Sequence, residues 1–299
     1  MSKHWSLADV PNLTGKRAVV TGVTSGIGEH TVTELARAGA DVILVARNPK
    51  KLQTTVKEVI LRAPRAKVDG VVGDLADLES VHSAAKEIES FGPISILVNN
   101  AGVMGTPHQR TKDGFELQFG TNHLGHFALT GLLLESLVDS GDARVVTLSS
   151  IMARAALKPP LGDPRVEGRY ERWSIYSQSK LANLMFAFEL DRRATKAGLP
   201  LTSVAAHPGY AHTALQKEVA IVDAFSGLIG QSAAMGALPS LMAATAPGLR
   251  GSTYIGPSGA FGTRGAPRIV KPPGPALNEE NARALWELSE DATGVRFLS

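Results

Sequence analysis

Short apolar runs rich in Val, Ile and Leu alternate with amphipathic helical patterns along almost the whole chain. Strands need such runs when helices cover both faces of their sheet. The predicted strands are residues 16–21, 41–46, 68–72, 94–98, 144–148, 201–206 and 253–255. The predicted helices are residues 26–38, 49–61, 77–90, a long helix within 113–138, 174–197 and 232–245. Repeated strand–helix units with right-handed crossovers predict an α/β fold with one doubly wound parallel sheet, a Rossmann fold.

Two segments interrupt this alternation, and neither looks like a linker between domains. Residues 153–172 combine prolines with mixed charges, residues 256–275 are rich in Pro and Gly, and both are predicted to be irregular. Residues 278–289 are predicted as a capped helix with Ala282, Leu285 and Trp286 on one face. We expect this face to dock on the core, with an oligomer contact as the alternative. Residues 1–299 are therefore predicted as a single domain.

The turn between the first strand and the first helix has the composition of a phosphate-binding site. Its glycines allow the backbone to approach a ligand closely, and the new helix points unpaired N–H groups at that ligand, which suits a pyrophosphate. An ordinary strand-to-helix turn is the alternative reading. The predicted cofactor contacts in this turn are Gly22, Thr24, Ser25, Gly26, Ile27 and Gly28.

Small or polar residues also follow the next strands, at the sheet edge where ligands of such folds bind. After the second strand, Ala46 offers no carboxylate to a ribose, and Arg47 offers donors for a 2′-phosphate. This favours NADP over NAD, although NAD remains possible and Arg47 could simply face solvent.

The ends of the third and fourth strands are assigned to the adenosine part of the same ligand. Asp74 is predicted to accept a hydrogen bond from the adenine amino group, with Leu75 packed nearby. A cap or turn role explains Asp74 almost equally well. Asn100, Ala101 and Gly102 are predicted to let the backbone approach a ribose, or else to form a structural turn.

Tyr176 and Lys180 lie four residues apart in a predicted helix and therefore on one face. A free phenol has a pKa of about 10, but a nearby ammonium and an oxidised nicotinamide would favour the phenolate. The pair could then exchange a proton with a carbonyl or alcohol. Ser149 and Ser150 follow the fifth strand, and we choose Ser150 as the hydroxyl that bonds a substrate oxygen. Asn122 could kink its helix and hold water, or be an ordinary polar residue.

Together these motifs resemble the short-chain dehydrogenase/reductase family over nearly the whole chain. The matching features, in family order, are Thr21-Gly22-x-x-x-Gly26-Ile27-Gly28, Asn99-Asn100-Ala101-Gly102, Asn122, Ser150, Tyr176-x-x-x-Lys180 and His207-Pro208-Gly209. The resemblance implies an NAD(P)-dependent oxidoreductase with the catalytic residues Asn122, Ser150, Tyr176 and Lys180.

The resemblance also implies a role for each of these residues. Tyr176 would be the general acid/base, and Lys180 would lower its pKa and bind the nicotinamide ribose. Ser150 would hold the substrate oxygen, and Asn122 would support a water relay. The interval between Ser150 and Tyr176 exceeds that of the plainest family members, which leaves Ser149 as the alternative to Ser150.

Further matches concern the nicotinamide and the branch of the family. The resemblance implies that Pro208 and Gly209 belong to the cofactor site and that Thr213 meets the nicotinamide carboxamide. The run from Asn122 to Phe127, Arg47 and the tail near residues 285–289 are similar to the retinol-dehydrogenase-like and protochlorophyllide-reductase-like branch.

Substrate recognition is expected from residues 104–112, 153–172 and 210–230. The last segment is rich in apolar residues and is predicted as a lid, so we expect an apolar carbonyl or alcohol substrate. Two alternatives remain. One is reduction of an activated carbon–carbon double bond, and the other is a non-catalytic NADP-sensing protein.

Other classes of protein are disfavoured by composition. The net charge is only +3 and no basic run is present, so we expect no nucleic-acid partner. His123, His126 and His207 are predicted as core or structural residues, with no metal site. We expect no secretory signal, no membrane span and a cytoplasmic location. The family resemblance implies a homodimer or homotetramer formed through the helices at residues 113–138 and 174–197.

Overall fold

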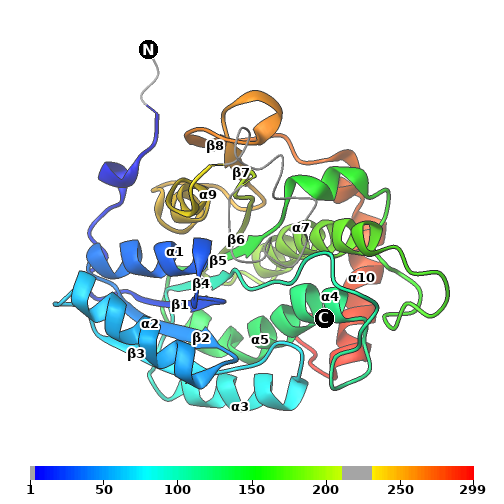
Figure 1. Cartoon of the computed structure of the whole chain (residues 1–299), viewed down its shortest axis with the longest axis horizontal. Helices are drawn as coiled ribbons and strands as arrows, with labels where there is room; N and C mark the ends of the chain where they lie inside the picture. The colour runs from blue at the N-terminus through cyan, green and yellow to red at the C-terminus, as the bar shows by residue number, and fades with distance from the viewer. Residues whose placement is uncertain (1–3, 211–230) are drawn as a thin grey trace.

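The computed structural model describes residues 4–210 and 231–299. Within these residues one sheet has the strand order β3-β2-β1-β4-β5-β6-β7-β8 (Figure 1). The strands are β1 (Arg17–Thr21), β2 (Asp41–Ala46), β3 (Val68–Val72), β4 (Ile96–Asn99), β5 (Ala143–Leu148), β6 (Leu201–Ala206), β7 (Tyr254–Pro257) and β8 (Pro267–Ile269). All neighbouring strands pair in parallel except β8, which is antiparallel to β7. The predicted doubly wound sheet is confirmed.

Helices cover both faces of this sheet (Figure 1). One face carries α1 (Gly26–Arg37), α2 (Pro49–Arg62) and α9 (Ala233–Thr245). The other face carries α3 (Leu78–Glu89), α5 (Gly125–Leu132), α6 (Leu134–Val138), α7 (Arg172–Lys196) and α10 (Glu279–Thr293). A short α4 (Leu117–Phe119) precedes α5. Apolar side chains on both faces of the strands are buried beneath these two layers, which explains the continuous Val/Ile/Leu runs.

Capping residues in the sequence mark where several of these helices begin and end. Asn48 is the N-cap of α2, where its side chain accepts a hydrogen bond from Lys51 N at 3.0 Å, and Pro49 follows at the first helical position. Gly294 is the C-cap residue of α10, and its left-handed backbone (φ 70°) suits glycine. The helix is longer than predicted because its periodic pattern continues to Thr293.

The long helix predicted within residues 113–138 is interrupted. Between α4 and α5 the chain forms a π-helical turn, Gly120–Leu124, and a further break precedes α6. The turn packs tightly against its surroundings, since a Cβ on Gly125 would lie 2.4 Å from the carbonyl oxygen of Leu75. An apolar repeat does not reveal one extra residue in a single turn. The turn contains Asn122, the residue that we suggested could kink its helix.

The prediction of an irregular segment at residues 256–275 is wrong at residues 256–257, which complete β7, and at residues 267–269, which form β8. In the pairing with β7, Ile255 lies opposite Ile269 and Pro257 opposite Pro267. Pro267 is tolerated because it is the first residue of an edge strand. The segment before α7 matches its prediction, since a 3₁₀ turn at Ile151–Ala155 is followed by irregular chain up to Glu171.

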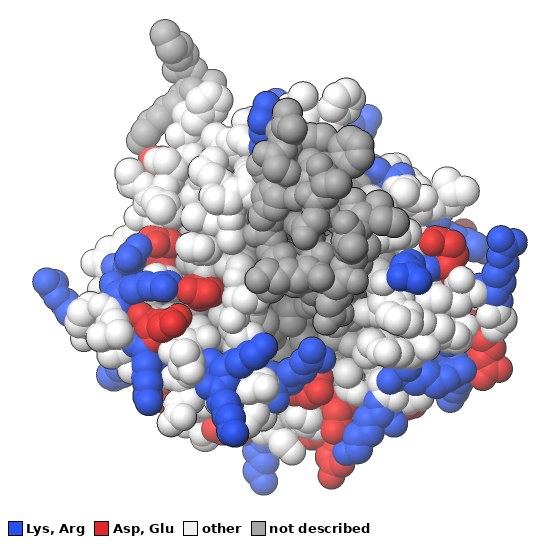
Figure 2. Space-filling model, viewed as in Figure 1, with Lys and Arg blue, Asp and Glu red and all other residues white. Residues whose placement is uncertain are grey.

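The surface carries both signs of charge. On the face drawn in Figure 2, Lys and Arg side chains lie in several separate groups with Asp and Glu between them. No helix within the described residues has both the length and the apolar character needed to cross a bilayer.

Candidate active site

The strand order reverses between β1 and β4, and the site is built at the carboxyl ends of these strands and of β5. Ser25 is the N-cap residue of α1, its backbone is extended, and its side chain makes no capping hydrogen bond. The first N–H groups of α1 are therefore left for a ligand. Gly28 is packed so closely that a Cβ there would lie 2.3 Å from the carbonyl oxygen of Gly22. The geometry fits an anionic group such as a pyrophosphate.

Asn100 fastens this glycine turn to the end of β4. Its Nδ2 donates to the carbonyl oxygens of Thr21 at 2.7 Å and Gly22 at 3.2 Å. The Thr21 hydroxyl accepts hydrogen bonds from the backbone N–H groups of Asn100 and Ala101, both at 3.0 Å. The side chain of Asn100 is thus used within the turn, in agreement with the structural alternative. Thr24 and Ile27 are half-buried beside it.

Gly102 lies between the turn and two of the predicted catalytic residues. A Cβ at Gly102 would stand 3.0 Å from Asn122 Oδ1 and 3.3 Å from Lys180 Nζ. The structure therefore brings the end of β4 together with the π-helical turn and with α7. A side chain at this position would press on Asn122 and Lys180.

Tyr176 and Lys180 lie on one face of α7, with Lys180 Nζ 5.9 Å from the centre of the Tyr176 ring. Burial lowers the pKa of Lys180 to about 8. Its ammonium donates to the carbonyl oxygen of Leu148 at 3.3 Å. An ammonium has three donors, so the described contact leaves room for a ligand's hydroxyl groups. The free donors of Lys180 fit the hydroxyl groups of a nicotinamide ribose.

The pKa of Tyr176 shifts in the direction opposite to the one we expected. Burial raises it, and a hydrogen bond with Ser150 opposes that rise. The described residues on balance therefore do not produce the predicted lowering. The predicted lowering would need the additional positive charge of an oxidised nicotinamide.

The two adjacent serines have different surroundings. Ser149 is buried, and its hydroxyl donates to the carbonyl oxygen of Lys180 at 2.7 Å. The hydroxyl of Tyr254 from β7 is also hydrogen-bonded to Ser149. Ser150 is half-buried and is hydrogen-bonded to the phenol of Tyr176. This arrangement favours Ser150 as the residue that meets a substrate.

Asn122 lies in the π-helical turn with its amide fully used. Its Oδ1 accepts from Val103 N at 2.7 Å, and its Nδ2 donates to Val103 O and to Ser179 Oγ, both at 3.0 Å. The side chain therefore holds the segment after β4 beside α7. Whether it also supports a water relay stays a prediction.

His126 links this turn to the glycine turn, a role that our sequence analysis missed. Its Nδ1 lies 2.9 Å from the carbonyl oxygen of Asn122, which can only accept, so Nδ1 carries the proton. Its Nε2 then accepts from the Thr21 hydroxyl at 2.9 Å. Burial lowers the pKa of His126 to about 4, so the ring is neutral at physiological pH. The four-residue spacing of Asn122 and His126 was the available signal.

Around the adenosine end, the predicted residues are more dispersed. Arg47 is exposed directly after β2, and its guanidinium makes no hydrogen bond or ion pair to the described residues. Lys50 and Lys51 are exposed in the first turn of α2. Asp74 accepts from Ala76 N at 3.0 Å in a local turn, as its structural alternative predicted. The side chain of Leu75 lies in the core.

At the nicotinamide end, Gly209 has φ 71°, and a Cβ there would lie 2.3 Å from the carbonyl oxygen of Thr263. The Pro208 carbonyl oxygen accepts from Gln231 Nε2 at 2.6 Å. His207 is buried, as predicted for a structural residue, and burial lowers its pKa to about 4. Thr213 and all but the first residue of the lid predicted at residues 210–230 lie outside the described residues.

Comparison with known proteins supports the same identification. A family model described as "short chain dehydrogenase" matches residues 16–222. The chain belongs to the short chain dehydrogenase family. It is 39% identical to human retinol dehydrogenase 13 over 98% of this chain and 88% of that protein. The resemblance stated from the sequence, including its retinol-dehydrogenase-like branch, is confirmed.

Two solved structures of the family are similar to this chain. The crystal structure of an uncharacterized protein from Mycobacterium paratuberculosis has a TM-score of 0.84 and 40% identity, with 99% of both chains covered. A family structure from Beutenbergia cavernae, solved with bound NADP at low occupancy, has a TM-score of 0.63 and 25% identity, covering 78% of this chain and 91% of that one. These comparisons support an oxidoreductase of this family that uses a nicotinamide dinucleotide as its cofactor.

Proposed function

We propose that this oxidoreductase uses NADP to interconvert a carbonyl and an alcohol on an apolar substrate. The observation that carries the proposal is the meeting of Ser150, Tyr176 and Lys180 beside the glycine turn, at the point where the strand order reverses. A protein that only binds the dinucleotide would not need a buried phenol hydrogen-bonded to a serine. All three residues suit proton transfer next to a hydride donor.

The chain's own groups have separate tasks in this reaction. When bound, the nicotinamide supplies or accepts the hydride and, when oxidised, a positive charge. Tyr176 Oη gives its proton to the carbonyl oxygen during reduction and removes a proton from the alcohol during oxidation. The Ser150 hydroxyl orients that oxygen. The Lys180 ammonium holds the ribose hydroxyls and stabilises the phenolate that remains after the proton has left.

The preference for NADP is supported by the adenosine end. Ala46 presents no carboxylate, while Arg47, Lys50 and Lys51 are exposed around the start of α2. A guanidinium can bind a phosphate through two parallel hydrogen bonds. The bound NADP in the Beutenbergia cavernae relative is consistent with this choice.

The apolar substrate is supported by the relatives' names and by the composition of residues 210–230. Human retinol dehydrogenase 13 is named for a retinoid alcohol, so retinal is the first substrate to test. Reduction of an activated double bond would use the same acid and the same hydride. The bound substrate, rather than the residues of the site, would distinguish the two reactions.

The decisive experiment follows NADPH oxidation with a panel that contains retinal, aromatic ketones, apolar aldehydes and enones. We expect turnover with carbonyl compounds and a loss of roughly 100-fold or more in kcat for Tyr176→Phe, because the general acid is removed. NADPH binding, followed by its fluorescence, should be unchanged in that variant. Turnover of enones to saturated ketones would establish the double-bond reaction, and tight binding without turnover would establish a sensor.

A further inference from the structure

Trp173 lies on the same face of α7 as Tyr176 and Lys180, although none of the segments predicted to recognise the substrate contains it. Residues three or four positions apart lie above one another along a helix. Because a helix rises about 1.5 Å per residue, Trp173 is roughly 4.5 Å from Tyr176 along the axis, on the side away from Lys180. The indole therefore stands where the body of a substrate would extend if its oxygen met Tyr176 and the nicotinamide lay beside Lys180.

The indole of Trp173 lies directly beside the phenol of Tyr176. The two ring centres are 6.5 Å apart, and the ring planes meet at 88°. Tyr176 is buried, whereas Trp173 is only half-buried. Part of the indole surface is thus open next to the predicted general acid. Aromatic rings pair best with other flat π-systems, stacked with an offset or edge to face, so this surface suits a flat conjugated group.

One side of the indole packs against the chain that follows β4. Gly105 has a left-handed backbone (φ 63°), and a Cβ there would lie 3.0 to 3.4 Å from three atoms of the six-membered ring of Trp173. Glycine adopts this backbone conformation without strain and leaves room for the ring. The backbone of Gly105 therefore supports the indole at close range.

A buried amide fixes both the indole and its support. Gln118 Oε1 accepts a hydrogen bond from Gly105 N at 2.7 Å. Its Nε2 donates to the carbonyl oxygen of Arg172 and to the hydroxyl of Tyr170, both at 2.9 Å. Both amide hydrogens and the amide oxygen are therefore used. Because Arg172 immediately precedes Trp173, this one side chain holds the start of α7 against the segment that carries Gly105.

Tyr170 fastens the same junction through a buried acid. Its hydroxyl lies 3.0 Å from Glu116 Oε1 and 3.1 Å from the carbonyl oxygen of Thr106. Glu116 is buried, and its second carboxylate oxygen accepts from Phe119 N at 2.7 Å. A satisfied buried network of this kind makes its surroundings rigid. The position of the indole is thus fixed before any ligand binds, which favours affinity.

We propose that Trp173 is a specificity-determining residue of the substrate site and that it stacks on a flat, conjugated carbonyl compound. The inference rests on the proposed function, because it takes Tyr176 as the group that meets the substrate oxygen. A conjugated body presents a π-face to the indole, and a saturated body of similar size does not. The indole therefore selects between substrates that have the same reacting group.

Binding of two matched ketones to the chain loaded with NADP⁺ tests the proposal without turnover, because a ketone and the oxidised cofactor cannot react. The probes are methyl naphthyl ketone and its decahydro analogue, with the dissociation constants measured by isothermal titration calorimetry. We expect Trp173→Leu to weaken binding of the naphthyl ketone by about 10-fold and that of the saturated ketone by no more than about 2-fold. Trp173→Phe keeps an aromatic ring and should restore most of the affinity.

Trp5→Leu is the matched control, because it removes another half-buried indole, which packs on the core beneath α1 and α9. It should change neither dissociation constant. Equal losses for both ketones in Trp173→Leu, no loss, or no binding of the naphthyl ketone to the native chain would each overturn the proposal. Failure of the proposed function gives a different result: the naphthyl ketone would bind through Trp173 but would never be reduced by NADPH.

A pair of glycine variants tests whether Gly105 supports the indole. Gly105→Ala places a methyl group against the ring, and we expect the same selective loss of affinity for the naphthyl ketone. Gly114→Ala is the control, since Gly114 also has a left-handed backbone (φ 86°) but a Cβ there meets no atom within 4 Å. Equal affinities for the naphthyl ketone in these two variants would contradict the proposal. If Gly105→Ala does not fold, the Trp173 variants decide alone.

Discussion

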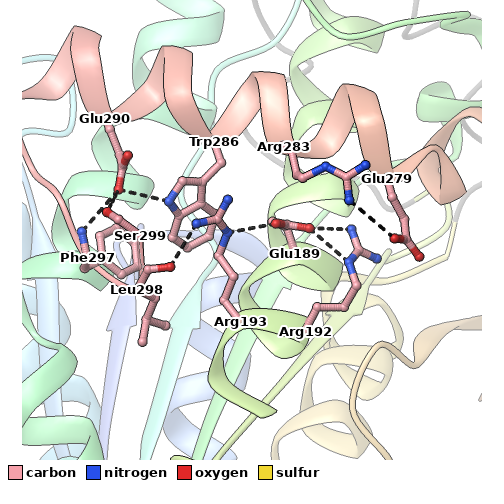
Figure 3. Close-up of polar contacts among 10 residues, drawn as sticks. All are labelled: Glu189, Arg192, Arg193, Glu279, Arg283, Trp286, Glu290, Phe297, Leu298 and Ser299. Carbon is pink, nitrogen blue, oxygen red and sulfur yellow. Dashed lines mark hydrogen bonds and ion pairs between the residues drawn. The ribbon is translucent and has the colours of Figure 1, made fainter. Parts of the chain in front are cut away.

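At the scale of single residues, α7 buries two charges in contrasting ways. Glu189 is paired with two arginines, so its burial is compensated (Figure 3). Lys180 is equally buried, but its ammonium donates a single hydrogen bond among the described residues, to the carbonyl oxygen of Leu148. An uncompensated charge costs stability, and such groups concentrate at functional sites. We interpret Lys180 as a residue that becomes fully satisfied only when a ligand binds.

The pKa of Lys180 leads to a prediction about stability. Its value falls from the ordinary 10.5 to about 8 on folding. Between these values the unfolded chain binds more protons than the folded chain, so stability rises with pH in this window. The penalty is fully present below about pH 8. We expect Lys180→Met to raise the free energy of unfolding at pH 7 by up to about 3 kcal/mol.

Urea denaturation without cofactor measures this effect. The advantage of Lys180→Met should shrink as the pH rises from 8 towards 10.5, while NADPH turnover is lost at every pH. The carbonyl oxygen of Leu148 keeps its bond from Asn183 Nδ2 at 2.9 Å, so the variant leaves no orphaned acceptor there. A variant less stable than the native chain at pH 7 would contradict the interpretation.

Arg47 leads to a prediction about cofactor choice. We expect Arg47→Ala to raise the KM for NADPH by about 10- to 100-fold, because a charge-assisted bond to the 2′-phosphate is lost. The KM for NADH should change little. Lys57→Ala is the control, since it removes an exposed charge from the middle of α2. Equal losses with both cofactors would place Arg47 outside the phosphate site.

At the scale of elements, two histidines connect the π-helical turn to different neighbouring elements. His126 ties it to the end of β1, and His123 ties it to α10 through Ser289 Oγ at 2.8 Å. Because the Ser289 hydroxyl donates to Leu285 O at 2.7 Å, it accepts from His123 Nε2. The turn that carries Asn122 is thus positioned by an element more than 150 residues later in the chain.

Ser289 is therefore expected to act on catalysis from a distance. Ser289→Ala removes the buried hydrogen-bond partner of His123 Nε2, which should cost about 1–3 kcal/mol in stability. Because the turn can then shift, we expect kcat to fall several-fold with little change in the KM for NADPH. The control is Thr293→Val, one turn further along α10, where the lost hydroxyl bonds only to Ser289 O and Val295 N. It should lower stability without lowering kcat.

At the scale of the whole molecule, the sheet separates two layers with different tasks. The layer of α1 and α2 borders the glycine turn and the exposed cations of the predicted adenosine site. The layer of α5 and α7 carries the predicted proton-transfer residues, and α10 with the tail covers its outer side. The predicted catalytic residues Asn122, Ser150, Tyr176 and Lys180 all lie in the described part of the chain.

This organisation predicts that the dinucleotide stabilises the whole molecule. A ligand that binds only the folded chain raises the free energy of unfolding. We expect the midpoint temperature from differential scanning calorimetry to rise when NADPH is added. A midpoint that NADPH leaves unchanged would contradict the predicted dinucleotide site.

The sequence by itself determined the order of strands and helices, the glycine turn and the shared face of Tyr176 and Lys180, because each rests on contacts between residues close in the chain. It could not determine which of Ser149 and Ser150 faces Tyr176, since a small shift of β5 against α7 exchanges them. The tertiary structure alone decided the pairing of β8, the bond between Thr21 and His126, and which helices the predicted core-facing side of α10 contacts. Those contacts join distant residues whose local patterns are compatible with several partners, and only the packing of the complete chain selects one.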